Sequence, residues 1–412
     1  VRHNITRSVL VIGEMALSIV LLIGAALLIR TFVALRTVDP GFNPHNVLTM
    51  SISLSGPQFQ RSAGVGDVVK KATERVQALP GVVTAAGSCC LPLLGGYGMP
   101  FIIAGRPLPN GQISHGGGAW VSASPGYFET FQIPIRRGRS FNVHDDSAAP
   151  AVVIINQAMA RKFWSEGDPL ADRLIIGKGI GPASEDVPRQ IVGIVGDVHD
   201  GGLNRDPQPT VYVPLAQIPD HTTAMNSRVG QMMFVTRTQV DPRRLSRAVE
   251  KELQRATGGL AVGLPMGRVR LMDDVLLLST ARADFDMLLL TIFGVSALLL
   301  AAIGIYGLSA YSVHQRTSEI GIRMALGATA SDVRWMVLMQ GMRLVWIGTA
   351  IGLMGAFGLS RVIGSFLFGV KALDPAVYAT VPVLLSAVAL FAVWFPARRA
   401  TRIAPSEALR YE

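Results

Sequence analysis

The sequence predicts an α-helical membrane protein with four transmembrane helices and one large α+β domain, inserted between the first and second helix. Four long apolar runs predict the helices, and alternating strand-like and helix-like segments between the first two runs predict the domain. The composition agrees, because 50% hydrophobic and 16% charged residues with a mean hydropathy of +0.39 indicate a mixture of membrane spans and water-facing chain.

The apolar runs are each long enough to cross a bilayer core, which takes about 20 residues of helix. They cover residues 9–29, 287–313, 336–359 and 376–397. The first run is too long for the apolar region of a cleaved signal peptide, and small cleavage-site residues do not follow it. We therefore divide the chain into a first span (1–30), an α+β domain (31–285) and a three-span region with a tail (286–412).

Arginine placement predicts the orientation. The net charge is +10, from 38 basic and 28 acidic residues. Arginines flank the chain start, the segment between the second and third runs, and the tail: Arg2, Arg7, Arg316, Arg323, Arg334, Arg398, Arg399, Arg402 and Arg410. Positive flanks stay cytoplasmic, so both termini are expected in the cytoplasm and the large domain on the far side of the membrane, which in a bacterium is the periplasm or the outer face of the cell membrane. The basic excess then reflects topology and lipid contact rather than nucleic-acid binding.

Two charges lie inside the apolar runs at similar depths, Glu14 in the first and Arg343 in the third. Charges at membrane depth either reach back to the interface separately or form pairs. Either reading fits the sequence; a Glu14–Arg343 ion pair would tie the first span to the other three.

The segment 31–285 has the texture of an α+β domain. Strands are predicted at 46–54, 150–155, 190–197, 210–214 and 232–236, and helices at 67–79, 156–164 and 242–256. The alternation in 46–54 predicts a half-buried strand. The Gly- and Pro-rich stretches 91–118 and 177–188 are expected to be loops.

Catalytic and metal patterns are weak. Asp197, His199 and Asp200 are metal-ligand types, as are residues 144–146, but the setting is typical of a turn and further ligands at defined spacing are missing. The glycine-rich stretch 177–181 lacks the Gly-x-x-x-x-Gly-Lys-Ser/Thr pattern that cradles phosphate. We therefore expect no metal, no cofactor and no catalytic residue in this chain. An enzymatic α+β domain is the most distant alternative.

The two cysteines are adjacent, Cys89 and Cys90. Neighbouring cysteines rarely reach relaxed disulfide geometry, so they are expected to be two small apolar residues in a packed segment.

The segment from His314 to Ala328 is a charged island between two apolar runs. Its pattern predicts a short amphipathic helix, a turn, and a new helix starting near Ser331. Such a helix can lie on lipid or fit a groove on a soluble partner, and the pattern alone does not choose.

Residues 316–328 resemble the signature of FtsX-like, MacB-type ABC transporter permeases, and residues 396–410 resemble that family's C-terminal motif. The α+β domain resembles the MacB-like periplasmic core domain along 127–134, 138–141, 191–198 and 211–214. One span, an outer domain and three spans is also the family's order. Residues 302–307 and 340–341 are similar to the duplicated permeases of acidobacteria, of which this chain would be a single unit, a split gene or a fragment.

The resemblance implies a permease that dimerises or pairs with a second permease unit and works with a cytoplasmic ATP-binding cassette ATPase, which uses the ATP. The helix near Glu319 would pass ATPase motion to the outer domain. A periplasmic adaptor is a further possible partner. The residues that would couple to the ATPase are Arg316, Glu319, Ile320, Arg323, Leu326 and Gly327. Within the family, efflux and lipoprotein release both remain open, as does a signalling scaffold that regulates an extracytoplasmic hydrolase.

Overall fold

The computed structural model describes residues 2–54, 59–95, 97–108, 111–178, 186–223, 232–258, 262–263, 270–315, 317–326, 328–364 and 367–400. The chain forms two compact units. The α/β unit comprises residues 38–280, and the helical unit comprises 1–37 with 281–412.

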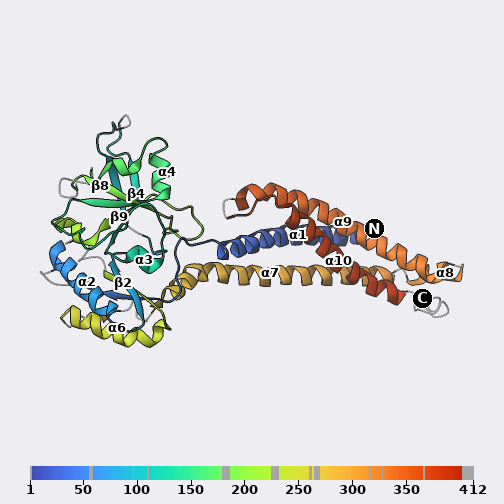
Figure 1. Cartoon of the computed structure of the whole chain (residues 1–412). Helices are drawn as coiled ribbons and strands as arrows, with labels where there is room; N and C mark the ends of the chain where they lie inside the picture. The colour runs from blue at the N-terminus through green and yellow to red at the C-terminus, as the bar shows by residue number, and fades with distance from the viewer. Residues whose placement is uncertain are drawn as a thin grey trace. The chain divides into compact units, whose positions relative to one another are not determined.

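The first half of the α/β unit is a sheet with two helices against it (Figure 1). Its strands are β1 (Val47–Ile52), β10 (Met232–Thr238), β2 (Val82–Ser88) and the short β11 (Val262–Gly263) and β12 (Arg270–Leu271), and its helices are α2 (Ser62–Gln77) and α6 (Pro242–Ala256). β1 is buried along its whole length rather than half-exposed as predicted, because β10, β11 and β12 flank it and α6 packs against it.

The second half is a closed ring of strands. β4 (Gly116–Ala123), β3 (Tyr97–Ile103), β7 (Arg173–Ile176), β8 (Arg189–Val195), β6 (Val152–Asn156) and β9 (Thr210–Pro214) follow in that order. β9 then pairs in parallel with β4, which closes the ring. The short β5 (Ile135–Gly138) pairs with β8 in antiparallel direction. Helix α4 (Gln157–Phe163) packs on β6, β8 and β9.

β3 and the first three residues of β4 correct the prediction of a loop at 91–118. Two of the glycines that suggested a loop, Gly116 and Gly118, make close contacts in the folded unit. A β-carbon at Gly118 would lie 2.9 Å from the Pro209 carbonyl oxygen, and one at Gly116 would lie 2.8 Å from the Phe163 ring. A glycine in a strand can mark such an approach rather than a turn.

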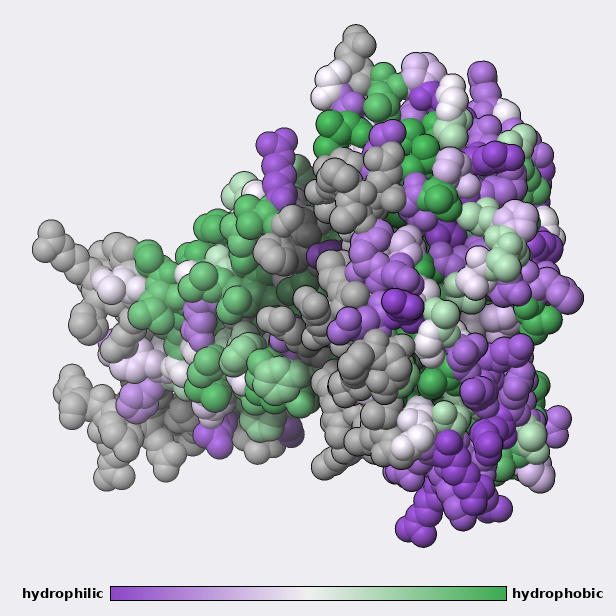
Figure 2. Space-filling view, turned by 90° about the vertical axis from the view of Figure 1, so that its left-hand side faces the viewer, coloured by the Kyte–Doolittle hydropathy of each residue, from purple (hydrophilic) through white to green (hydrophobic). Residues whose placement is uncertain are grey.

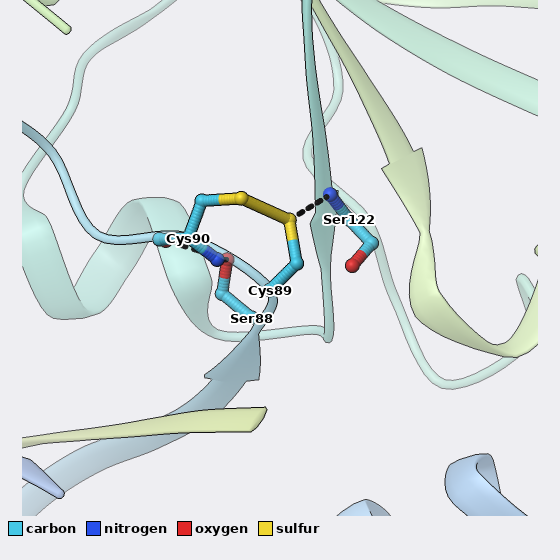
Figure 3. The surroundings of a disulfide bond; sticks show 4 residues. All are labelled: Ser88, Cys89, Cys90 and Ser122. Atoms are coloured by element: carbon cyan, nitrogen blue, oxygen red, sulfur yellow. Dashed lines mark hydrogen bonds between the residues drawn. A yellow bond between two sulfur atoms is a disulfide. The ribbon is translucent and has the colours of Figure 1, made fainter. Parts of the chain in front are cut away.

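Cys89 and Cys90 correct a second prediction, because the structure joins them in a disulfide (Figure 3). The chain turns directly after β2, which brings both sulfur atoms to one side. The Ser88 hydroxyl holds this turn: it donates to the Cys90 carbonyl oxygen at 2.8 Å and accepts from the Cys90 amide at 3.2 Å.

The helical unit consists of α1 (Arg2–Arg36), α7 (Met272–Gln315, whose first turns belong to the α/β unit), α8 (Thr317–Ala325), α9 (Ala330–Ile363) and α10 (Pro375–Ala400). Among the described residues, α1, α7, α9 and α10 are long and apolar enough to cross a membrane. Figure 2 shows hydrophobic residues, in green, over the exposed helical surface, whereas the surface of the α/β unit is more hydrophilic.

A face of glycines on α9 receives α1. A β-carbon at Gly348 would lie 2.6 Å from the Met15 Cβ, and one at Gly352 would lie 2.7 Å from the Ile19 Cβ. Small residues four apart allow two membrane helices to approach closely. Hydropathy alone did not predict this contact, although the Gly348–Gly352 spacing is its sequence signal.

An ion pair joins α1 to the start of α10. Arg30 donates from Nη1 to Asp374 Oδ2, and the other carboxylate oxygen of Asp374 accepts from the amide of Ala376 at 2.9 Å. Asp374 therefore caps α10 and fixes it to α1 with the same side chain.

Candidate functional site

The end of the helical unit at which α1 begins and α10 ends also carries α8 (Figure 1). A pocket of about 160 Å³ lies there between α1, α7, α8 and α9. Its lining includes Ser8 of α1, Ser309 of α7, Glu319 and Arg323 of α8, and Gln340 of α9. The structure thus places α8 as one wall of a pocket formed by three membrane helices.

α8 is anchored by one side chain. Ile320 is 8% exposed and packs with Val313 of α7 and Val333 of α9, with Met324 and Val337 at the edge of the cluster. Ile320 was predicted as one of the residues that couple to the ATPase; the structure buries it within its own chain, where it holds α8 against the ends of α7 and α9.

Glu319 and Arg323, both predicted as docking charges, form an ion pair on the surface of α8. Arg323 Nη2 lies 2.6 Å from Glu319 Oε1, and Arg323 Nη1 lies 3.1 Å from the Met336 sulfur. The Arg323 side chain is 46% exposed and the Glu319 side chain is 52% exposed. Their i,i+4 spacing predicts such a pair.

Two large apolar side chains lie exposed beside this pair. Ile322 is 46% exposed and Leu326 is 83% exposed. Leu326 was predicted as part of the site and Ile322 was not. The position of Ile322 in the amphipathic pattern was the sequence signal that could have identified it. We call Glu319, Ile322, Arg323 and Leu326 the α8 face. An exposed apolar and charged surface of this kind is typical of binding sites for lipid or protein.

The turn after α8 is held by local hydrogen bonds. The Ala328 amide donates to the Arg323 carbonyl oxygen at 3.0 Å. Thr329 and Asp332 then cap α9 reciprocally, with side chain and amide paired in both directions. The predicted restart of a helix near Ser331 therefore has a capping box as its cause. Arg316 and Gly327 of the predicted site lie outside the described residues.

The sequence left open whether Glu14 and Arg343 pair with each other or reach the membrane interface separately. Among the described residues, these two side chains do not form an ion pair with each other. The Glu14 carboxylate lies against Gly304 of α7, at a place where a β-carbon would overlap it. Arg343 is exposed on α9. The structure thus places the Glu14 side chain against α7 and leaves Arg343 exposed on α9.

Two of the metal-type residues of the α/β unit, Asp197 and Asp145, have structural partners. Asp197 accepts from the Ala158 amide and from Arg161, both at 2.6 Å, and so satisfies an amide in the first turn of α4. Both carboxylate oxygens of Asp145 accept hydrogen bonds from Arg139 at 2.7 Å. Burial raises the pKa of Asp145, but the hydrogen bonds from Arg139 and from the Asn142 amide outweigh burial and lower this pKa. Within the described part of the chain, no three His, Cys, Asp or Glu side chains gather into a metal site.

Comparison with known proteins gives two family models that together cover most of the chain. The MacB-like periplasmic core domain matches residues 8–252, more than half of the chain, and the FtsX-like permease C-terminal domain matches residues 291–405.

Individual relatives agree. The macrolide export ATP-binding/permease protein MacB of Chromobacterium violaceum is 27% identical over 294 residues, 69% of this chain and 42% of that protein. The pyoverdine export ATP-binding/permease protein PvdT of Pseudomonas entomophila is 28% identical over 296 residues, 68% of this chain and 41% of that protein. The chain thus spans about two-fifths of the length of these relatives.

A solved structure, the periplasmic region of MacB from Actinobacillus actinomycetemcomitans, is similar over 57% of this chain and 92% of that chain, with 14% identity and a TM-score of 0.37. That score is too low to carry an argument, so the assignment rests on the family models. The chain belongs to the family of MacB/FtsX-type ABC transporter permeases, inner-membrane proteins with a MacB-like periplasmic core domain between the first and second transmembrane helices.

Proposed function

We propose that this chain is the permease part of an ABC-type export complex that passes motion, driven by ATP hydrolysis outside these 412 residues, to its periplasmic domain. The observation that carries the proposal is the α8 face, an exposed surface anchored by Ile320 to the ends of two membrane helices. A force on α8 would reach α7 and α9 directly through this buried contact. The relatives are export proteins whose names join ATP binding with permease function, which supports export over a signalling role.

In this proposal both termini and α8 lie in the cytoplasm, where an ATP-binding cassette partner meets the α8 face. Arginines concentrate at that end, among them Arg323, Arg334, Arg398 and Arg399, as the positive-inside rule requires. The exposed apolar faces of α7 and α9 would then meet lipid or a second copy of the permease.

The test is a charge reversal on the α8 face. The full chain carrying Glu319→Lys is co-expressed with each ATP-binding cassette subunit of the source genome, and co-purification and ATPase stimulation are measured. We expect both to fall by about tenfold, equivalent to about 1.4 kcal/mol of binding free energy, without loss of folded protein. Unchanged binding and stimulation would refute docking at this face.

A swapped pair separates docking from helix stability. Glu319→Arg with Arg323→Glu keeps an i,i+4 pair on α8, whose contribution to the helix is only about 0.5 kcal/mol. If the residues dock a partner, the swap stays defective; if they only stabilise α8, the swap restores function. Glu166→Lys, at an exposed carboxylate of the α/β unit, is the matched control and is expected to behave as wild type.

A further inference from the structure

The two halves of the α/β unit share a very narrow stretch of sheet. β2 belongs to the first half and β4 to the closed ring, and their register consists of the single pair Ser88↔Ala123. Hydrogen bonds between Gly87 and Ser124 continue the contact on one side: each backbone amide donates to the other residue, at 2.8 Å and 2.9 Å. Continuity of the sheet therefore depends on a few residues at the end of β2.

The Cys89–Cys90 disulfide lies on the other side of that pair (Figure 3). The Ser122 amide of β4 donates to the Cys89 sulfur at 3.3 Å, and the Cys89 amide donates to the Ser122 carbonyl oxygen at 3.2 Å. The disulfide is thus part of the contact between the halves. Because its two cysteines are adjacent, it closes a small covalent ring that fixes the backbone at the end of the β2–β4 ladder.

Both cysteines are partly exposed, whereas Leu91 and Leu93 after them are buried. A periplasmic location keeps disulfides oxidised, and an exposed disulfide is the kind that thiolates attack and that serves regulation.

We propose that Cys89–Cys90 is a redox-modification site, reduced by a periplasmic dithiol protein of the thiol–disulfide oxidoreductase class, and that its state sets how firmly the halves of the periplasmic domain are joined. A thiolate of the dithiol protein attacks one cysteine sulfur and forms a mixed disulfide. The second thiol of that protein then resolves it, so that Cys89 and Cys90 become two thiols and the oxidoreductase leaves as a disulfide.

Reduction opens the covalent ring and frees both side chains to rotate. The Cys89 sulfur then no longer has a fixed position under the Ser122 amide, and the adjoining Ser88↔Ala123 pair loses its covalent support. The ladder should open locally, at lower free energy than the rest of the sheet.

A groove of about 460 Å³ runs across the same joint. One wall comes from α2 in the first half, the other from residues 142–148 and 214–216 around the closed ring, and Ser124 to Gly126 line it beside β4. A change in the joint would therefore move the walls of this groove relative to each other. The inference is independent of the ATPase-coupling proposal, because it concerns the periplasmic domain alone.

The experiment uses the full chain in membranes, before and after treatment with dithiothreitol or with a purified thioredoxin-type dithiol protein. Iodoacetamide labelling followed by mass spectrometry counts free thiols, and hydrogen exchange reports opening. We expect no labelling before reduction and two labels after it. Amide exchange at 88–90 and 122–124 should then be faster, on the order of tenfold.

The strand β6 provides an internal control, since it pairs with β8 and β9 and not with β2 or β4, and its exchange should not change. In the variant Cys89→Ala/Cys90→Ala the exchange at 122–124 should be fast with or without reductant. Three results would overturn the proposal: labelling of both cysteines without reductant, reduction that leaves exchange at the joint unchanged, or reduction by dithiothreitol but not by the dithiol protein.

Discussion

Asp200 carries a carboxyl group in an unfavourable place. Its Oδ2 is buried and has no hydrogen-bond partner among the described residues. Burial raises the pKa of Asp200 from 3.8 to about 7. Tyr127 and Tyr212 lie near it, and burial followed by the charge of Asp200 raises the pKa of both phenols. A neutral Asp200 suits this apolar, aromatic surrounding, and an ionised one does not.

The folded state consequently holds the Asp200 proton to higher pH than the unfolded chain. The stability that neutral Asp200 contributes is complete below about pH 4, declines as pH rises, and is lost above about pH 7. Asp200→Asn should therefore raise the apparent melting temperature of the full chain relative to wild type at pH 8 and much less at pH 5. The gain in unfolding free energy at pH 8 is at most about 4 kcal/mol, because each unit of pKa difference is equivalent to about 1.4 kcal/mol. An equal effect at both pH values would contradict the assignment.

Single residues differ in how far the sequence predicts them. The Glu319–Arg323 pair follows from its i,i+4 spacing, and the capping box of Thr329 and Asp332 from its residue types. The position of the Glu14 side chain cannot be predicted in this way, because it depends on Gly304. This glycine is distant in sequence and becomes a neighbour of Glu14 only when α1 and α7 pack together.

At the scale of elements, the order of spans, most helices and several strands could be predicted, because each depends on local periodicity. α6 and β9 have the predicted bounds, 242–256 and 210–214. The strands β3 and β4 could not be predicted. Gly116 and Gly118 of β4 lie against Phe163 and Pro209, contacts that form only in the folded ring. The burial of β1 was equally a consequence of what packs around it.

The contact between α1 and α9 leads to a matched pair of variants. Gly352→Ala would place a methyl group 2.7 Å from the Ile19 Cβ and 2.8 Å from the Ala16 carbonyl oxygen, so the helices must separate. We expect a lower apparent melting temperature in detergent, corresponding to about 1–3 kcal/mol for overpacking.

Gly358→Ala is the control, because nothing lies within 4 Å of a β-carbon there. Alanine favours helix over glycine by about 1 kcal/mol in soluble helices, so this variant should match or exceed wild type. If the two alanine variants melt at the same temperature, the glycine face does not set the distance between α1 and α9.

For the whole molecule, the proposed topology predicts opposite accessibility for two exposed positions, Leu326 after α8 and Val143 in the α/β unit, which are 83% and 69% exposed. In a chain with Cys89→Ala and Cys90→Ala, a single Val143→Cys should react with a membrane-impermeant maleimide in intact spheroplasts. Leu326→Cys should react only after the membrane is permeabilised. The reverse pattern would invert the proposed orientation.

The closed ring of the α/β unit has a consequence for association. A sheet that pairs β9 back to β4 leaves neither of these strands with a free edge on which another chain could add a strand. The exposed strand beside it, β5, is short and carries Arg136 and Arg137, charges that discourage edge-to-edge pairing. Partners of this half of the periplasmic domain should therefore recognise side chains rather than backbone, and the ring should resist the strand-to-strand aggregation to which open sheets are prone.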